Sequence, residues 1–215
     1  MENPTRGYFH GVSRVRAVAP SVIIFVRHGQ TTTNAQRLLV GRSDPDLTEL
    51  GVAQAHALGP FLRDVKEVWT SPLRRARETA RIAMPDLVAT VKESFIEVDY
   101  GALEGKPVTA LASELWERDH DLALGDGESL ASVDTRVQRE LDAMLFDSTS
   151  LLHQSDGHLA IVSHVSPIKS AAVWALGAPP STVWRMRLDN GSITTVGVRQ
   201  TSPLLVHFNM LPTLA

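Results

Sequence analysis

The chain has 215 residues, of which 43% are hydrophobic and 21% charged, with a formal net charge of -3 and no cysteine. This length and composition fit one α/β domain with a sizeable core. The lack of cysteine excludes disulfides, thiol nucleophiles and cysteine-ligated metals, and it fits a cytoplasmic protein. The sequence has no block of like charges and no apolar run of membrane-helix length, so it predicts neither a nucleic-acid nor a membrane partner.

The first twenty residues stand apart from the rest of the chain. They contain Arg6, Arg14 and Arg16 but no apolar segment of signal-peptide length. We therefore expect residues 1–20 to be a poorly ordered N-terminal extension, or the result of a start site placed too early. Residues 21–215 are expected to form a single domain.

An apolar run over residues 22–26 predicts a buried strand, and its lack of alternation is typical of a parallel one. Arg27, His28 and Gly29 follow directly. In an open α/β sheet, ligands bind just beyond the carboxyl ends of the strands. Arg27 and His28 are therefore candidates for an anion-binding cation and for a histidine that attacks or carries a proton. Taken alone, such a tripeptide is more often an ordinary strand end.

Strands and helices alternate along the rest of the chain. Hydrophobic runs predict strands over 65–70, 87–91 and 159–163. Periodicity and capping residues predict helices over 49–62, 72–83, 107–118, 130–145 and 167–176, with Ser71-Pro72 and Ser166-Pro167 as cap-and-proline starts. The tail predicts antiparallel strands over 182–188, 192–198 and 204–208, with Asn190-Gly191 as a hairpin turn. The predicted fold is α/β: a doubly wound, mostly parallel sheet flanked by helices, with a C-terminal antiparallel hairpin.

Two arginines, Arg74 and Arg75, open the helix that follows the second strand. A cation there opposes the helix dipole, whereas the free N–H groups of a helix start favour an anion. We therefore expect Arg75 to bind a ligand and Arg74 to face solvent. The long polar loop over 30–46 contains Asn34, and loops of this length are often functional.

Two further residues are candidates for acid–base work. Glu97 lies between Ile96 and Val98, and a carboxyl flanked by apolar groups is a candidate general acid, although an exposed loop acid is an equal alternative. His164 directly follows the strand over 159–163. A structural histidine is the alternative there, but its placement at a second strand end parallels that of His28.

Doubly wound topology can gather these groups at one edge of the sheet. Together they suit a small dense anion such as phosphate, because arginine binds it through paired, charge-assisted hydrogen bonds. One histidine would then be the nucleophile, and neighbouring arginines would hold its pKa down so that it stays neutral. The other imidazole, if charged, would stabilise the transferring phosphoryl group, and Glu97 would protonate the leaving oxygen and later activate water.

Three segments of the chain match a known family pattern in order: Arg27-His28-Gly29-Gln30-Thr31 with Asn34, Ser71-Pro72-Leu73 with Arg75-Ala76, and Ser163-His164. The chain resembles the histidine phosphatase superfamily, also called phosphoglycerate mutase-like, and within it the phosphatase branch. The resemblance implies a phosphohistidine on His28 and a proton donor at Glu97. It also implies a phosphate pocket, to which we assign Arg27, Asn34, Arg75, His164 and Val165. No metal and no organic cofactor is expected.

The chain departs from the family pattern at two places. Val165 and Ser166 follow the second histidine where many members have two glycines, and Leu103 stands where many have an aromatic residue. Neither change removes a catalytic group, but both bear on the substrate. Arg37 and Arg42 are candidates for binding a second anionic group, with solvated loop charges as the default interpretation.

The leading hypothesis is a metal-independent phosphomonoester hydrolase that acts on small phosphorylated metabolites. The resemblance also favours hydrolysis over a phosphoglycerate mutase-type transfer. The cofactor-dependent mutases of the family usually carry a longer segment between the acid and the second histidine, which helps to enclose the phosphoenzyme, whereas the stretch over 105–159 is short here and should let water reach the site. A catalytically silent phosphate-binding protein is a further alternative. A metal-dependent hydrolase is disfavoured because the eight histidines lack clustered ligand spacing. The protein is expected to be a monomer or a homodimer.

Overall fold

A computed structural model of the chain describes residues 21–112, 119–147, 158–199 and 202–214, so the predicted extension over 1–20 lies outside the described residues. The described strands form one six-stranded sheet in the order β3-β2-β4-β1-β5-β6. Its strands are β1 Val22–Arg27, β2 Val65–Thr70, β3 Ala89–Val91, β4 His158–Ser163, β5 Ile193–Arg199 and β6 Ser202–Met210. Strands β1 to β4 pair in parallel, whereas β5 runs antiparallel to both β1 and β6. The predicted α/β class and the C-terminal antiparallel pair are confirmed.

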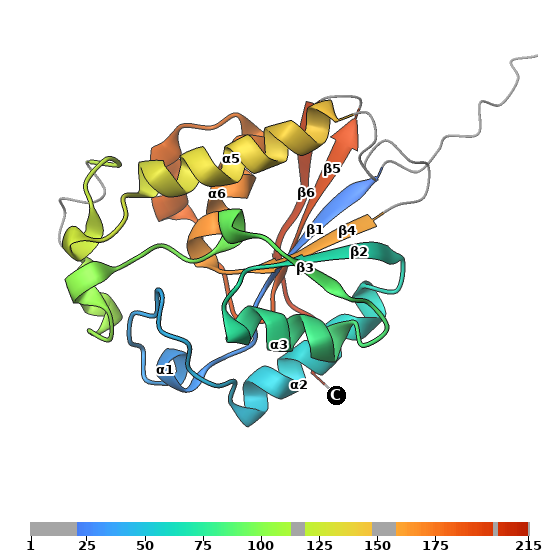
Figure 1. The fold of residues 1–215 in the computed structure, drawn as a ribbon, viewed down its shortest axis with the longest axis horizontal. Helices are drawn as coiled ribbons and strands as arrows, with labels where there is room; N and C mark the ends of the chain where they lie inside the picture. The colour runs from blue at the N-terminus through green and yellow to red at the C-terminus, as the bar shows by residue number, and fades with distance from the viewer. Residues whose placement is uncertain (1–20, 113–118, 148–157, 200–201, 215) are drawn as a thin grey trace, which may run out of the picture.

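Helices cover both faces of the sheet, with α5 and α6 on one face and α2 and α3 on the other (Figure 1). The α-helices are α1 Thr32–Ala35, α2 Glu49–Leu58, α3 Arg74–Ala83, α5 Leu130–Phe146 and α6 Val165–Leu176. Short 3-10 turns fill the connections: η1 Gly59–Phe61, η2 Glu93–Phe95, η3 Gly101–Leu103, η4 Val108–Ala112, η5 Leu124–Asp126 and η7 Pro180–Arg185. The stretch that carries η3 and η5 lies beside the sheet, on the same side as α1 (Figure 1).

Strand β1 supplies apolar side chains to both faces of the sheet. Ile23 and Phe25 belong to the core cluster under α5 and α6, whereas Ile24 and Val26 belong to the cluster under α2 and α3. Successive side chains of a strand point to opposite faces, so a strand covered on both sides needs an unbroken apolar run. That arrangement holds the end of β1 rigidly in the middle of the sheet.

Both predicted cap-and-proline starts are wrong. Helix α3 begins at Arg74, and α6 begins at Val165 with His164 as its N-cap. The Ser71 hydroxyl instead accepts from the Leu73 N–H and forms a hydrogen bond with the His164 ring. The side chain predicted to cap a helix therefore contacts a residue far away in the sequence. Pro167 lies in the first turn of α6, where a missing N–H costs no helical hydrogen bond.

Two other predicted elements need correction. The stretch over 182–188 is not a strand: η7 and an extended segment occupy it, because the prolines at 179 and 180 favour a helical turn and lack N–H donors for a ladder. The Asn190-Gly191 turn consequently joins no hairpin and packs against the end of β1 instead. The helix predicted over 107–118 is η4 in its described part, and 113–118 lie outside the described residues.

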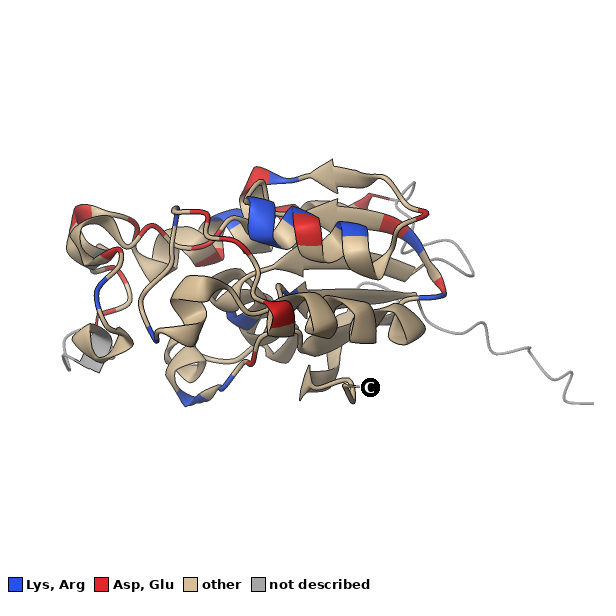
Figure 2. Cartoon of the chain, turned by 90° about the horizontal axis from the view of Figure 1, so that it is seen from below, with Lys and Arg blue, Asp and Glu red and all other residues tan. Residues whose placement is uncertain are grey.

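Charged residues of both signs are interspersed over the ribbon in the view of Figure 2, with both signs along α3. Across the described ranges, no helix has the length and apolar character needed to cross a membrane.

Candidate active site

The two histidines lie side by side because they follow neighbouring parallel strands. Arg27 pairs in register with Ser163, so His28 and His164 come next on β1 and β4. The His28 N–H donates to the Ser163 carbonyl at 3.0 Å, and the ring centroids of the two histidines are 5.0 Å apart. The expected gathering of strand ends therefore occurs at the carboxyl edge of the sheet.

His28 is buried and held in one tautomer. Its Nδ1 lies 2.7 Å from the Gly29 carbonyl oxygen, which accepts but cannot donate, so Nδ1 carries the proton. The lone pair is then on Nε2, which accepts from Arg75 Nε at 3.3 Å. Burial, followed by the charges of Arg75 and Arg27, holds the pKa of His28 well below its usual 6.5. The ring is therefore neutral and has a nucleophilic nitrogen.

Arg75 is the most confined cation in the described part of the site, with 1% of its surface exposed. Besides His28, its guanidinium donates to the Ser43 carbonyl at 2.6 Å and the Gly41 carbonyl at 2.9 Å. Burial lowers the pKa of Arg75, opposed by the carboxylates of Glu97 and Asp44. Arg74, by contrast, is exposed and pairs with Asp46, so the prediction that it faces solvent is confirmed.

The loop that holds Arg75 is itself held by Glu104, a residue whose structural role sequence reasoning missed. The Glu104 carboxylate accepts from the N–H of Gly41 at 3.0 Å and of Ser43 at 3.3 Å. Asp44, in the same loop, accepts from the Arg75 N–H at 3.1 Å and so caps α3 across space. The sequence holds no local pattern that predicts these partners for Glu104 and Asp44, because both are charged residues in polar loops.

Arg27, the last residue of β1, is a second cation at this edge of the sheet. One guanidinium nitrogen donates to the Leu188 carbonyl at 2.6 Å, and its buried Nε has no hydrogen-bond partner among the described residues. Burial lowers the pKa of Arg27 to about 10, so the side chain remains a cation at neutral pH. A buried cationic N–H without an acceptor is a position that an anion would satisfy.

Glu97 is buried beside the start of α6 and accepts three backbone N–H groups. These come from Val98 at 2.8 Å, Val165 at 3.1 Å and Ser166 at 3.2 Å. The alternative of an exposed loop acid is therefore wrong, since only 4% of Glu97 is exposed. Val165, assigned to the phosphate pocket from the sequence, donates its backbone N–H to Glu97 in this structure.

His164 is fully buried, and its ring is anchored through the opposite nitrogen from that of His28. Its Nε2 lies 2.7 Å from the Ser71 hydroxyl, while Nδ1 has no partner among the described residues. Burial, then Arg75, His28 and Arg27, hold the pKa of His164 well below 6.5. The His164 imidazole is therefore neutral in the free protein, whereas the sequence analysis considered a charged ring.

Asn34 contacts the segment after β1 together with the side-chain amide of Asn190, a residue that the sequence analysis assigned only to a turn. The Asn34 side-chain oxygen accepts from Thr31 N–H at 3.1 Å and from Asn190 Nδ2 at 3.2 Å. Asn190 Nδ2 also donates to the His28 carbonyl at 3.2 Å. The Asn-Gly pair therefore contributes to the site from the C-terminal part of the chain.

Arg42 has a protein partner rather than a free position. It pairs with Glu128 at 3.2 Å, and Glu128 also pairs with Arg136 at 2.8 Å. In the described ranges, no group of three or more histidine, aspartate and glutamate side chains is placed to hold a metal ion.

Comparisons with known proteins identify relatives of this chain. The chain is 33% identical over 188 residues to the Bifunctional protein Rv2228c of Mycobacterium tuberculosis, covering 81% of this chain and 50% of that protein. It is 31% identical over 191 residues to a 2,3-bisphosphoglycerate-dependent phosphoglycerate mutase of Methylocella silvestris, covering 79% of this chain and 88% of the mutase. The chain thus spans about half the length of the first of these curated relatives.

A phosphoserine phosphatase from Entamoeba histolytica, solved in complex with 3-phosphoglyceric acid, has a similar structure, with a TM-score of 0.80 and 25% identity. The match covers 91% of this chain and 100% of that one. The family model for the histidine phosphatase superfamily (branch 1) matches residues 23–211, which include every candidate site residue. This chain belongs to the histidine phosphatase superfamily.

Proposed function

We propose that the protein is a metal-independent phosphomonoester hydrolase that acts on small phosphorylated metabolites through a phosphohistidine on His28. The observation that carries the proposal is the state of His28: a neutral buried ring whose Nδ1 is fixed on the Gly29 carbonyl and whose Nε2 faces Arg75. Nucleophilic attack requires this form of the ring. The phosphatase from Entamoeba histolytica supports hydrolysis as the reaction class.

In the first step, the Nε2 lone pair attacks phosphorus and the bond from phosphorus to the alcohol oxygen breaks. Glu97, in its acid form, gives its proton to that oxygen, and the alcohol leaves. In the second step, Glu97 takes a proton from water, the water oxygen attacks phosphorus, and the N–P bond breaks. Inorganic phosphate leaves, while His28 returns to its neutral form and Glu97 to its acid form.

The phosphoryl oxygens would be held by the groups that surround His28. Arg27 Nε and His164 Nδ1 have no protein partner among the described residues, so each is available to an oxygen of the substrate. Arg75, whose Nε donates to His28 Nε2, and Asn34 complete the proposed set. Donors placed in advance around a transferring phosphoryl group stabilise its charge without reorganisation.

A mutase-type transfer is the second candidate, because the Methylocella silvestris mutase matches this chain over 88% of its own length. Both reactions share the first half, so the acceptor of the phosphoryl group distinguishes them. Incubation with 3-phosphoglycerate and 2,3-bisphosphoglycerate should release inorganic phosphate if water is the acceptor. Formation of 2-phosphoglycerate without phosphate release would favour the mutase.

The direct test is hydrolysis of p-nitrophenyl phosphate in excess EDTA between pH 4 and 9, with the wild type beside His28→Ala. We expect the wild type to release p-nitrophenol and the variant to lose at least about 10⁴-fold of that rate. Reversible loss of wild-type activity in EDTA would overturn the metal-free mechanism. Equal rates for the two proteins would overturn the assignment of His28.

A further inference from the structure

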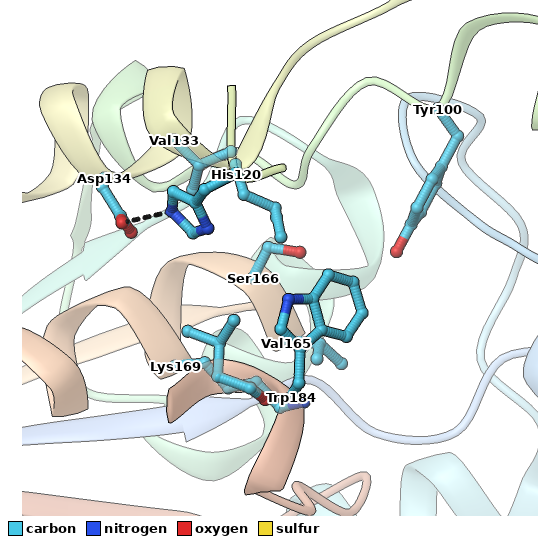
Figure 3. A pocket seen from close by; sticks show the side chains of 10 residues that line it. Tyr100, His120, Val133, Asp134, Val165, Ser166, Lys169 and Trp184 are labelled. Atoms are coloured by element: carbon cyan, nitrogen blue, oxygen red, sulfur yellow. Dashed lines mark hydrogen bonds and ion pairs between the residues drawn. The ribbon is translucent and has the colours of Figure 1, made fainter. Parts of the chain in front are cut away.

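A pocket of about 110 Å³ opens at the start of α6, where Val165 and Ser166 line it. We call it the Lys169 pocket. Side chains from α5, α6, η7 and the loops that precede α5 form its walls (Figure 3). None of the groups assigned to phosphate binding except Val165 contributes to its lining.

The pocket adjoins the group that is proposed to protonate the leaving oxygen. Val165 and Ser166 line it, and their backbone N–H groups both donate to the Glu97 carboxylate. An alcohol oxygen that receives a proton from Glu97 would therefore lie near the Val165 and Ser166 end of this pocket. The carbon portion of that alcohol would extend into it.

Most of the pocket wall is apolar. Leu130, Val133, Val183 and the Trp184 indole form it, and the Tyr100 ring closes one side (Figure 3). Burial raises the pKa of the Tyr100 phenol, which therefore stays neutral. Walls of this kind favour an aliphatic or aromatic body rather than a polyhydroxylated one.

Lys169 places one positive charge in these apolar surroundings. Its Nζ donates to the Val183 carbonyl at 3.0 Å, which uses one of its three N–H donors. Burial, with a contribution from Arg27 and against the opposing effect of the Glu97 charge, lowers the pKa of Lys169 to about 8, so the ammonium form persists at neutral pH at a desolvation cost. An anion in the pocket would offset that cost.

The nearby carboxylates of the protein have other partners. Asp134 pairs with His120 at 2.7 Å, and Glu97 accepts three backbone N–H groups. Within the described ranges, Lys169 makes no ion pair with an acidic side chain. One ammonium matches one monoanion, whereas a second phosphate group would bring excess negative charge close to Asp134, which lines the same pocket.

From these contacts we infer that the Lys169 pocket selects phosphomonoesters whose alcohol has an apolar or aromatic body and one carboxylate, which Lys169 binds. This inference rests on the proposed function, because it places the leaving alcohol by means of Glu97. His120 Nδ1, buried in the same lining with no partner among the described residues, offers a further polar contact.

The test compares 3-carboxyphenyl phosphate with its neutral isostere 3-carbamoylphenyl phosphate at pH 7. We expect Lys169→Met and Lys169→Gln each to lower the acid-to-amide ratio of kcat/KM by about tenfold, chiefly through KM of the acid. The amide should keep its wild-type value within about twofold. Lys66→Met is the matched control, since Lys66 is exposed near the amino end of β2, and it should leave the ratio unchanged.

An unchanged ratio in both Lys169 variants would overturn the inference, and so would an equal loss for the two esters. The 3-phosphonooxyphenyl phosphate is a third substrate: a stronger Lys169-dependent preference for it would overturn the assignment to a carboxylate. If the wild type hydrolyses neither ester and matches His28→Ala, the proposed function fails. Calorimetric binding of the same acid and amide to the wild type and Lys169→Met then decides the inference about the pocket.

Discussion

His28 and His164 occupy equivalent positions at the ends of adjacent parallel strands, yet their rings are fixed through opposite nitrogens. A backbone carbonyl holds Nδ1 of His28, so the lone pair is on Nε2, which accepts from Arg75 Nε at 3.3 Å. The Ser71 hydroxyl holds Nε2 of His164, which leaves Nδ1 without a partner among the described residues. Because Ser71 already accepts from the Leu73 N–H, its own proton can go to His164, and Nδ1 then carries a hydrogen.

This difference supports the complementary roles that we propose for two similar side chains. An imidazole with a free lone pair attacks phosphorus, whereas one with a free N–H donates to a phosphoryl oxygen. Both rings are neutral for the same reason, since burial and nearby arginines lower both pKa values. Hydrogen-bond partners, rather than protonation state, therefore distinguish the two histidines.

The largest effect expected from this comparison is a difference in kcat between His164→Ala and His28→Ala. Removal of one donor to the transferring group should lower kcat for p-nitrophenyl phosphate by about 10² to 10³, less than the loss in His28→Ala. Phosphohistidine should still form in His164→Ala, and acid-quench labelling with a ³²P ester would detect it. A complete absence of labelled protein would contradict the donor role, because it would place His164 in the attack itself.

The strands and the amphipathic helix were predictable from sequence because their signals are local. The apolar run over 22–26 became β1, and the face of Val133, Val137 and Leu141 became the buried side of α5. The order of strand-end motifs also predicted which side chains would meet. The roles of those side chains, the assembly state and the cytoplasmic location stay predictions.

The parts that sequence reasoning missed depend on partners distant in the chain. Ser71 was assigned to a helix cap because the hydroxyl's other partner, His164, is 93 residues away. Glu104 holds a loop 61 to 63 residues earlier, and Asn190 contacts a carbonyl 162 residues earlier. Local propensity cannot rank such contacts, since only the folded sheet brings these segments together.

The next effect concerns stability rather than rate. Both histidines have a folded-state pKa below the unfolded value of 6.5, so the unfolded chain binds protons first as the pH falls. Their contribution to stability is therefore complete above pH 6.5 and declines below it, with a slope of about 1.4 kcal/mol per pH unit for each ring. Urea unfolding at pH 6.5, 6.0 and 5.5 would measure that slope.

The matched comparison uses His28→Gln, His164→Gln and the exposed His207→Gln. Each buried substitution should reduce the pH slope of the free energy of unfolding, whereas His207→Gln should leave it near the wild-type value. The slope is the informative quantity because any packing defect shifts the whole curve and leaves its gradient unchanged. A wild-type slope in both buried variants would show that these rings titrate alike in the folded and unfolded states.

The smallest effect addresses the hydroxyl that sets the His164 tautomer. Ser71→Ala removes the partner of Nε2, so the ring loses its fixed tautomer and orientation, and kcat should fall about tenfold with little change in KM. Nitrogen-15 chemical shifts of His164 should report the mixed tautomer directly. Thr70→Val is the control, since the neighbouring Thr70 hydroxyl is equally buried but has no hydrogen-bond partner in the described part of the chain. If Ser71→Ala and Thr70→Val gave the same kcat and the same His164 shifts, the two histidines would differ by something other than the groups that hold their rings.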